Sequence, residues 1–254
     1  MQLAFGAGAL WGNRTDVTGS GIGPDQFGIL QDVQIDWDWQ TKELWGQYQF
    51  PLDIARGQGK ITGKAKFARI FGAIYGDLFF GQTPAAGQVT VSENEAATVP
   101  ASAPYTVVVG NAATYGDDLG VYYATGTNAG SRFTRVTSPS AAGQYSVNLA
   151  TGVYTFAAAD AGAALLVSYL YTTTSGKKLV ITNQFMGYTP VFKATFYTVK
   201  TTGGVPAALS LVLNACTATK LSLPTKIDDY EIQEFDFSAF ADATGTVGTW
   251  SSAE

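Results

Sequence analysis

The amino-acid sequence predicts a mainly β protein, in which a β-sandwich or barrel with one flanking α-helix carries a second, small β-sandwich as an insertion. Three observations predict it. Polar and apolar residues alternate cleanly in several runs, which is the period of a strand with one buried face. Thr, Ser, Gly, Tyr, Phe and Val abound, as in strands joined by many turns. The character of the sequence also changes at about residue 82 and changes back at about residue 176.

The first strong strand signal is "VQIDWDWQ", residues 33–40. Its odd-numbered positions are apolar or aromatic and its even-numbered positions are Gln or Asp, so we expect one buried face and one polar face. The alternation resumes in residues 44–52 after Thr41 and Lys42, and the two runs are expected to form a hairpin or a long bent pair.

Residues 57–81, "GQGKITGKAKFARIFGAIYGDLFFG", are expected to form a strand followed by a helix. Residues 60–67 alternate, which predicts a strand with lysines on its polar face. From Arg69 the apolar spacing becomes that of an amphipathic helix of about three turns, which Gly81 would end. The predicted contacts between this helix and the core are Ile70, Phe71, Ile74 and Leu78.

Residues 83–175 differ from the rest of the chain. They carry short β runs separated by turns at regular spacing, which favours a small β-sandwich. One hairpin is expected around "LATG", residues 149–152. Long strands return after Gly176. The segment is therefore predicted to be an inserted accessory domain, within a discontinuous domain built from residues 1–82 and 176–254.

The composition excludes several kinds of site. The chain has 254 residues and no histidine, which excludes Ser-His-Asp triads, Cys-His dyads and His-ligated zinc. Cys216 is its only cysteine, and its apolar surroundings predict a core residue. The net charge is −5, and no basic stripe exists that could clamp nucleic acid. No apolar run is long enough for a membrane span, so we expect no membrane partner. We also expect no cofactor.

Gly63 and Lys64 resemble part of a phosphate-binding loop. The spacing argues against one, because three residues rather than four separate Gly59 from Gly63, and Ala65 stands where the motif requires Ser or Thr. The dinucleotide pattern G-x-G-x-x-G fails at Thr62. These glycines and lysines are therefore interpreted as parts of a strand.

Two acidic groups invite a chemical interpretation. Asp36 and Asp38 lie two positions apart on one strand face, about 6.5–7 Å from each other, which is compatible with a glycosidase carboxylate pair. The acidic residues between positions 228 and 236 could bind calcium. Because such alternation is ordinary and no calcium-loop motif is present, we favour polar strand faces for both groups.

The five tryptophans leave a carbohydrate-binding interpretation open. Trp37 and Trp39 share the apolar face of their strand, which favours the core or a subunit interface. Trp45 falls on the polar face of its run and is the best candidate for an exposed contact.

The order of the segments is itself informative. A glycine-rich start is followed by "ILQDVQIDWDW", "LWGQYQFPLDIARGQGKITGKAKF", one helix, the inserted β-sandwich and "LNACTATKLSLPTKIDDYEIQEFDFSAFAD". This ordered set, which covers most of the chain, resembles phage tail tube proteins (major tail proteins). The insertion, with "GQYSV", "GVYTFAAADAG" and "VSYLYT", resembles small accessory β-domains, of Ig-like type, on phage virion proteins.

The resemblance implies a non-enzymatic structural protein of the virion tail, assembled in the host cytoplasm. Six copies would join their sheets into a ring, and stacked rings would form a tube through which DNA passes during ejection. Its partners would be further copies of itself, the tail terminator, the baseplate or tip, and the tape measure protein. Joining sheets across subunits would remove exposed strand edges.

The resemblance also implies which side chains face the lumen of the tube. An acidic or neutral polar wall would keep DNA phosphates from sticking, so passage would involve no specific binding. If the lysine strand neighbours the aspartate strand, ion pairs between them would leave the wall nearly neutral. The acidic residues at 228–236 are expected on a solvated or lumen-facing strand. The candidate lumen-facing residues are Asp36, Asp38, Gln40, Lys64 and Lys66.

An insertion of this size would project outward, where a contractile tail carries its sheath, so we expect a non-contractile tail. Two other functions stay open. One is another β-protein of the virion, such as a head decoration protein or a tail terminator. The other is a carbohydrate-binding module or glycosidase that uses Trp45 with Asp36 and Asp38.

Overall fold

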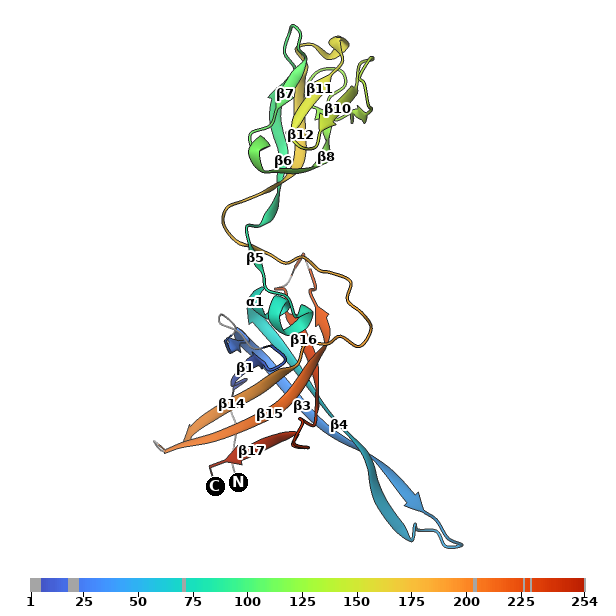
Figure 1. The fold of residues 1–254 in the computed structure, drawn as a ribbon, viewed down its shortest axis with the longest axis vertical. Coiled ribbons are helices and arrows are strands. Elements are labelled where there is room, and N and C mark those ends of the chain that lie inside the picture. Colours follow the sequence, from blue (N-terminus) through green and yellow to red (C-terminus); the bar gives the residue numbers. More distant parts are fainter. Residues whose placement is uncertain are drawn as a thin grey trace. The chain divides into compact units, whose positions relative to one another are not determined.

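A computed structural model describes residues 6–17, 23–69, 72–202, 205–225, 227–228 and 230–253. The chain is mainly β, as the sequence predicts (Figure 1). It divides into two units. Unit 1 comprises Met1–Pro84 and Leu179–Glu254, and unit 2 comprises Ala85–Lys178. The junctions expected from the sequence stand at 82/83 and 175/176, against 84/85 and 178/179 in the structure.

Unit 1 is built on one sheet in which the described neighbours pair antiparallel. The order is β2-β1-β14-β15-β16-β4-β3, and β17 also pairs with β15. The strands are β1 (Ala9–Arg14), β2 (Asp25–Gln26), β3 (Ile29–Leu44), β4 (Asp53–Arg69), β14 (Phe192–Thr202), β15 (Val205–Ser222), β16 (Gln233–Phe240) and β17 (Gly248–Ser252).

A short helix packs on one face of this sheet. It begins as α1 (Gly72–Ile74) and continues as the π-helix η1 (Tyr75–Phe80). It ends at Gly81, whose φ of +65° is the left-handed conformation that glycine adopts most readily after a helix. The predicted end at Gly81 is therefore confirmed. The predicted start at Arg69 is wrong, because Arg69 still belongs to the ladder of β4.

Two described side chains of the helix are fully buried in the core of unit 1, and Phe79 packs against this core partly buried. Ile74 and Leu78 are both buried there, as predicted, whereas the other two predicted contacts, Ile70 and Phe71, lie outside the described residues. The sheet supplies mainly aromatic partners, whose large area dominates the burial of a core. These partners include Leu10, Phe27, Phe67, Phe192, Phe235 and Phe237.

β3 and β4 form a hairpin that runs past the rest of the sheet (Figure 1). β4 pairs with β16 only over residues 61–67, whereas its pairing with β3 continues to Leu44 and Asp53. The pairing expected between residues 33–40 and 44–52 is wrong. Both runs alternate, but alternation does not say which strands pair, and the connection is the segment 45–52.

Unit 2 is a β-sandwich of two sheets with a core of its own. One sheet has the order β7-β11-β10-β9 and the other β6-β12-β8. The predicted hairpin is confirmed, because β10 and β11 pair across the turn at residues 149–152. The elements are β5 (Ala85–Ala86), β6 (Val89–Thr98), β7 (Thr106–Val108), η2 (Ala112–Thr114), β8 (Tyr115–Tyr123), β9 (Thr134–Arg135), β10 (Gln144–Asn148), β11 (Val153–Phe156), η3 (Ala158–Asp160), β12 (Ala164–Thr172) and β13 (Lys177–Lys178).

Buried carboxylates in unit 2 act as hydrogen-bond acceptors for tyrosines. Asp118 accepts the hydroxyl protons of Tyr145 at 2.6 Å and Tyr154 at 3.0 Å. Asp160 accepts from the Tyr123 hydroxyl and the Gly143 backbone N–H. Because a buried polar group is costly unless it is paired, these contacts are interpreted as stabilising the fold.

Candidate functional site

The face of the unit 1 sheet opposite the helix is polar across four strands. On the helix side, Phe67, Phe235 and Phe237 are buried. Because β3, β4, β16 and β15 are in antiparallel register, the side chains on the other face line up in cross-strand rows. The first row is Asp32, Lys66, Glu234 and Ser222; the second is Gln34, Lys64, Asp236 and Lys220; the third is Asp36, Thr62, Ser238 and Thr217; the fourth is Asp38 and Lys60.

Acidic and basic side chains alternate along these rows, so this polar face carries almost no net charge. The Nζ of Lys64 lies 3.2 Å and that of Lys66 lies 4.0 Å from the carboxylate of Glu234. The hydrogen bond from Lys64 lowers the pKa of Glu234 below its ordinary value. The acids on the face are Asp32, Asp36, Asp38, Glu234 and Asp236, against the bases Lys60, Lys64, Lys66 and Lys220.

The ion pairs described for these lysines run to β16 and not to the aspartates of β3. The expected neighbourhood of the two strands is present, since β3 pairs with β4. However, Thr62 stands opposite Asp36, and the Nε2 of Gln34 donates to both carboxylate oxygens of Asp36 at 3.0 and 3.1 Å. The neutralising partners therefore come largely from a strand distant in sequence.

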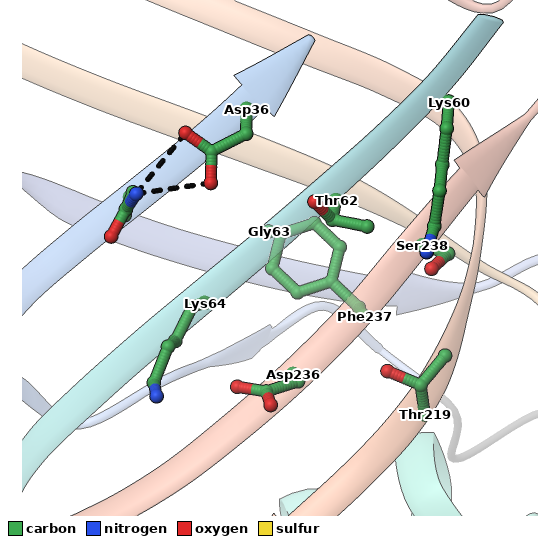
Figure 2. A pocket seen from close by; sticks show the side chains of 10 residues that line it. Asp36, Lys60, Thr62, Gly63, Lys64, Thr219, Asp236, Phe237 and Ser238 are labelled. Carbon is green, nitrogen blue, oxygen red and sulfur yellow. Dashed lines mark hydrogen bonds between the residues drawn. The ribbon is translucent and has the colours of Figure 1, made fainter. Parts of the chain in front are cut away.

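A hollow of about 280 Å³ lies among these side chains (Figure 2). Asp36 lines it and Asp38 does not, so the structure does not bring the two carboxylates together over one cavity. A glycosidase pair needs both carboxylates to flank one bond of a bound sugar, which this arrangement does not offer. The lining residues are Gln34, Asp36, Lys60, Thr62, Gly63, Lys64, Thr219, Asp236, Phe237 and Ser238.

Gly63 and Lys64 serve opposite faces of β4. Phe237 is the direct cross-strand partner of Gly63, and its ring lies against the glycine on the core face (Figure 2). A Cβ at position 63 would lie 2.1 Å from the Cζ of Phe237, so only glycine leaves room for the ring. Lys64 points to the polar face and pairs with Glu234. The glycine and lysine that resemble a phosphate loop thus belong to packing and to charge balance.

Four of the five predicted lumen-facing residues share this one face. Asp36 and Asp38 of β3 stand in rows with β4, as do Lys64 and Lys66. Gln40 lies at an irregularity, because the register shifts between Trp39 and Thr41. Whether the face lines a lumen stays a prediction.

The tryptophans of the hairpin form a partly exposed aromatic group on the core side of the sheet. The rings of Trp37 and Trp250 lie 5.9 Å apart between centroids, and the guanidinium of Arg56 lies 4.7 Å from the centre of the Trp39 ring. Trp37 and Trp39 remain about two-fifths exposed, so in one copy they are not core residues. Trp45 is 56% exposed, in line with its prediction as an exposed contact.

The end of the hairpin is an exposed apolar segment of unit 1. We call residues 44–54 the hairpin tip. Its large apolar side chains are more than half exposed, with Phe50 at 80%. The only charged residue in the tip is Asp53. The exposed apolar side chains are those of Leu44, Trp45, Tyr48, Phe50, Leu52 and Ile54.

The acidic run near the C-terminus divides between two environments. Glu234 and Asp236 alternate with buried phenylalanines and belong to the polar face of β16, where the sequence left open a solvated or lumen-facing strand. Asp228 and Glu231 are exposed, and Asp229 lies outside the described residues. Among the residues that the structure describes, no group of three or more acidic or thiol side chains is placed to hold a metal ion.

Sequence reasoning missed the pairing that unites the polar face. The alternation of acids and phenylalanines in "EFDF" indicates that Glu234 and Asp236 lie on a polar strand face. It does not indicate that this strand lies beside β4, because the two are more than 150 residues apart in sequence. Lys220 is hidden further by a register shift in β15.

Within the described ranges, no helix has the length and apolar character needed to cross a membrane. A comparison with protein-family models and with curated proteins finds no match to this chain.

Proposed function

We propose that this protein is a self-assembling structural subunit of a phage tail tube, in which rings of six copies stack to form the tube. The observation that carries the proposal is the β3–β4 hairpin, which leaves the sheet with large apolar side chains in water. Contiguous exposed apolar surface marks an interaction site, and an isolated two-stranded hairpin is only marginally stable in water. A neighbouring copy would bury the exposed apolar side chains and would stabilise the hairpin.

The free edge of β3 supports the same proposal. Among the described strands, β3 pairs only with β4, although it is 16 residues long. Long unpaired edges readily add a strand from another chain. Joining the sheets of neighbouring copies into a ring uses that tendency in an ordered way.

The polar face suits the wall of a tube that carries DNA. Alternating acids and bases give it a small net charge, and two of its four lysines, Lys64 and Lys66, pair with Glu234. A wall of this kind offers few free cations to bind phosphates and little net charge to repel them. In this proposal the tube belongs to the virion tail, and its partners are further copies, the tail terminator, the baseplate or tip and the tape measure protein.

The hairpin tip gives the proposal a direct test. Replacing both Tyr48 and Phe50 by serine removes two exposed aromatic side chains from the tip and leaves the core untouched. Sedimentation velocity should show large assemblies for the unaltered protein and mainly single chains for the variant. A matched control replaces the exposed Val91 of unit 2 by serine and should assemble normally. Normal assembly of the double variant would count against the hairpin as the carrying contact.

One observation favours a second function. The exposed rings of Trp45, Tyr48 and Phe50 lie within a few residues of each other, and aromatic rings are a common platform for sugars. A carbohydrate-binding module predicts glycan-array binding that Trp45→Ala abolishes, and a single chain that stays monomeric at high concentration. A tail terminator or head decoration protein would instead give closed rings or trimers that do not stack.

A further inference from the structure

A second exposed apolar segment of unit 1 directly follows unit 2 in the sequence. Residues 179–191, which we call the anchored loop, form no strand or helix and contain no charged residue. Phe185 is 94% exposed and Met186 is 102% exposed. Its exposed large apolar side chains are Val180, Ile181, Phe185, Met186 and Tyr188.

The loop is held in place at several points. The backbone N–H of Thr15 donates to the carbonyl of Val191 at 2.9 Å, which ties the loop to the end of β1. The hydroxyl of Tyr188 donates to the carbonyl of Gly81 at 3.4 Å, which ties it to the end of the helix. Side-chain hydrogen bonds join Gln82 to Thr182 and Thr189 to Thr217. Phe185 and Met186 therefore belong to a segment that hydrogen bonds tie to the rest of unit 1.

A tight turn presents these side chains. The N–H of Tyr188 donates to the carbonyl of Phe185 at 3.1 Å, and Gly187 has a φ of +93°. A positive φ at the third position of a hydrogen-bonded turn is the reason that glycine stands there. Phe185 and Met186 therefore occupy the first two positions of a defined turn, with their apolar side chains in water.

We infer that the anchored loop of one copy is the receptor for the hairpin tip of the next copy, an inference that rests on the proposed self-assembly. Both surfaces are apolar and nearly uncharged, since Asp53 is the only charged residue among 44–54 and residues 179–191 contain none, so apolar packing would hold them together. Their eleven exposed apolar side chains present on the order of 1,500 Å², which matches the total area of a standard protein interface.

The positions of the two surfaces decide the kind of contact. Figure 1 shows the hairpin tip and the anchored loop at opposite ends of unit 1. A contact between two different surfaces is heterologous, so it repeats from copy to copy and does not close as a dimer. Such a contact gives a closed ring if its rotation closes and an open stack if it does not, and surfaces at opposite ends of unit 1 favour a contact between successive rings.

Cysteine cross-linking tests this contact in the full chain. The double variant Phe50→Cys with Met186→Cys places one thiol on each surface, and mild oxidation should link successive copies into a ladder of oligomers on a denaturing gel. The native Cys216 is buried and should not form a disulfide, because burial raises its pKa to about 12. The matched control is Phe50→Cys with Val91→Cys, which should give no species larger than a dimer.

The outcomes separate this inference from the proposed function. Assembly of the unaltered protein without the ladder, or with equal ladders in test and control, overturns the inference alone. Absence of assembly at any concentration overturns both. As a second measurement, Phe185→Ser with Met186→Ser should raise the concentration for half-assembly at least tenfold, and an unchanged concentration overturns the inference. Because both side chains are exposed, the thermal melt of this variant should match that of the unaltered protein.

Discussion

Gly63 resembles part of a binding motif in the sequence but has a packing role, against Phe237, in the structure. In sequence, Gly63 and Lys64 resemble the end of a phosphate loop. In the structure the glycine gives room to the Phe237 ring on the core face, while the lysine pairs with Glu234 on the other face. A large ring over a strand glycine restores the packing that a missing side chain would lose.

Replacing Gly63 by alanine tests this packing. The new Cβ would lie 2.1 Å from the Cζ of Phe237, so the ring must leave its position. We expect the free energy of unfolding to fall by about 1–3 kcal/mol, the usual cost of overpacking a core. Gly72→Ala is the control, because a Cβ there meets nothing within 4 Å. Equal denaturant midpoints for the two variants would contradict the role given to Gly63.

Asp242 predicts an acid dependence of stability. Its carboxylate accepts hydrogen bonds from the Thr244 hydroxyl at 2.6 Å and the Thr246 N–H at 3.0 Å, which lower its pKa from 3.8 to about 2. Because the folded pKa lies below the unfolded one, this stabilisation is present above about pH 4 and is lost as pH falls towards 2. The melting-temperature difference between the unaltered protein and Asp242→Asn should therefore shrink over this range. A difference that stays constant from pH 5 to pH 2 would refute the assignment.

At the scale of elements, the faces of strands could be predicted and their partners could not. Residues 60–67 have the expected buried and polar sides, because alternation depends only on local sequence. In residues 33–40 the two faces are separated as expected, but Trp37 and Trp39 on the apolar face stay exposed in one copy. The hairpin partner of residues 33–40 was predicted wrongly, since residues 44–52 alternate too. Residues 53–59 contain two glycines and look like a loop, yet the long ladder with β3 holds them as strand.

The helix is the element whose burial is easiest to test. Ile74 is fully buried against the aromatic core, and Ile74→Asp would place an unpaired charge there. We expect a loss of about 3–5 kcal/mol, a large part of the stability of a typical domain. Ile74→Val should cost only about 0.5–1.5 kcal/mol. Circular dichroism melts would measure both, and a folded, normally assembling Ile74→Asp protein would show that the helix does not pack as described.

At the scale of the whole molecule, the two units have separate cores, and the chain passes between them twice. Ala85 and Lys178 are direct partners in the β5–β13 ladder, so both chain crossings lie side by side. The insertion itself could be predicted from the change in composition. The polar face could not, because it depends on the pairing of β16 with β4 across the whole of unit 2 in sequence.

Removing unit 2 tests the independence of the two units. If residues 85–178 are replaced by a short Gly-Ser link, unit 1 keeps its aromatic core and both proposed assembly surfaces. We expect the shortened chain to fold and to assemble as the full chain does, measured by sedimentation velocity. An unfolded or permanently monomeric product would mean that unit 2 takes part in folding or assembly.

In the proposed assembly, copies of this chain build a tube whose bore is lined by the polar face. Cryo-electron microscopy of the concentrated, purified protein measures this most directly. We expect stacked six-fold rings in which the rows of β3, β4 and β16 face the bore. A protein that remains a single chain or a closed trimer at every concentration would contradict it, as would a tube whose bore is lined by another face.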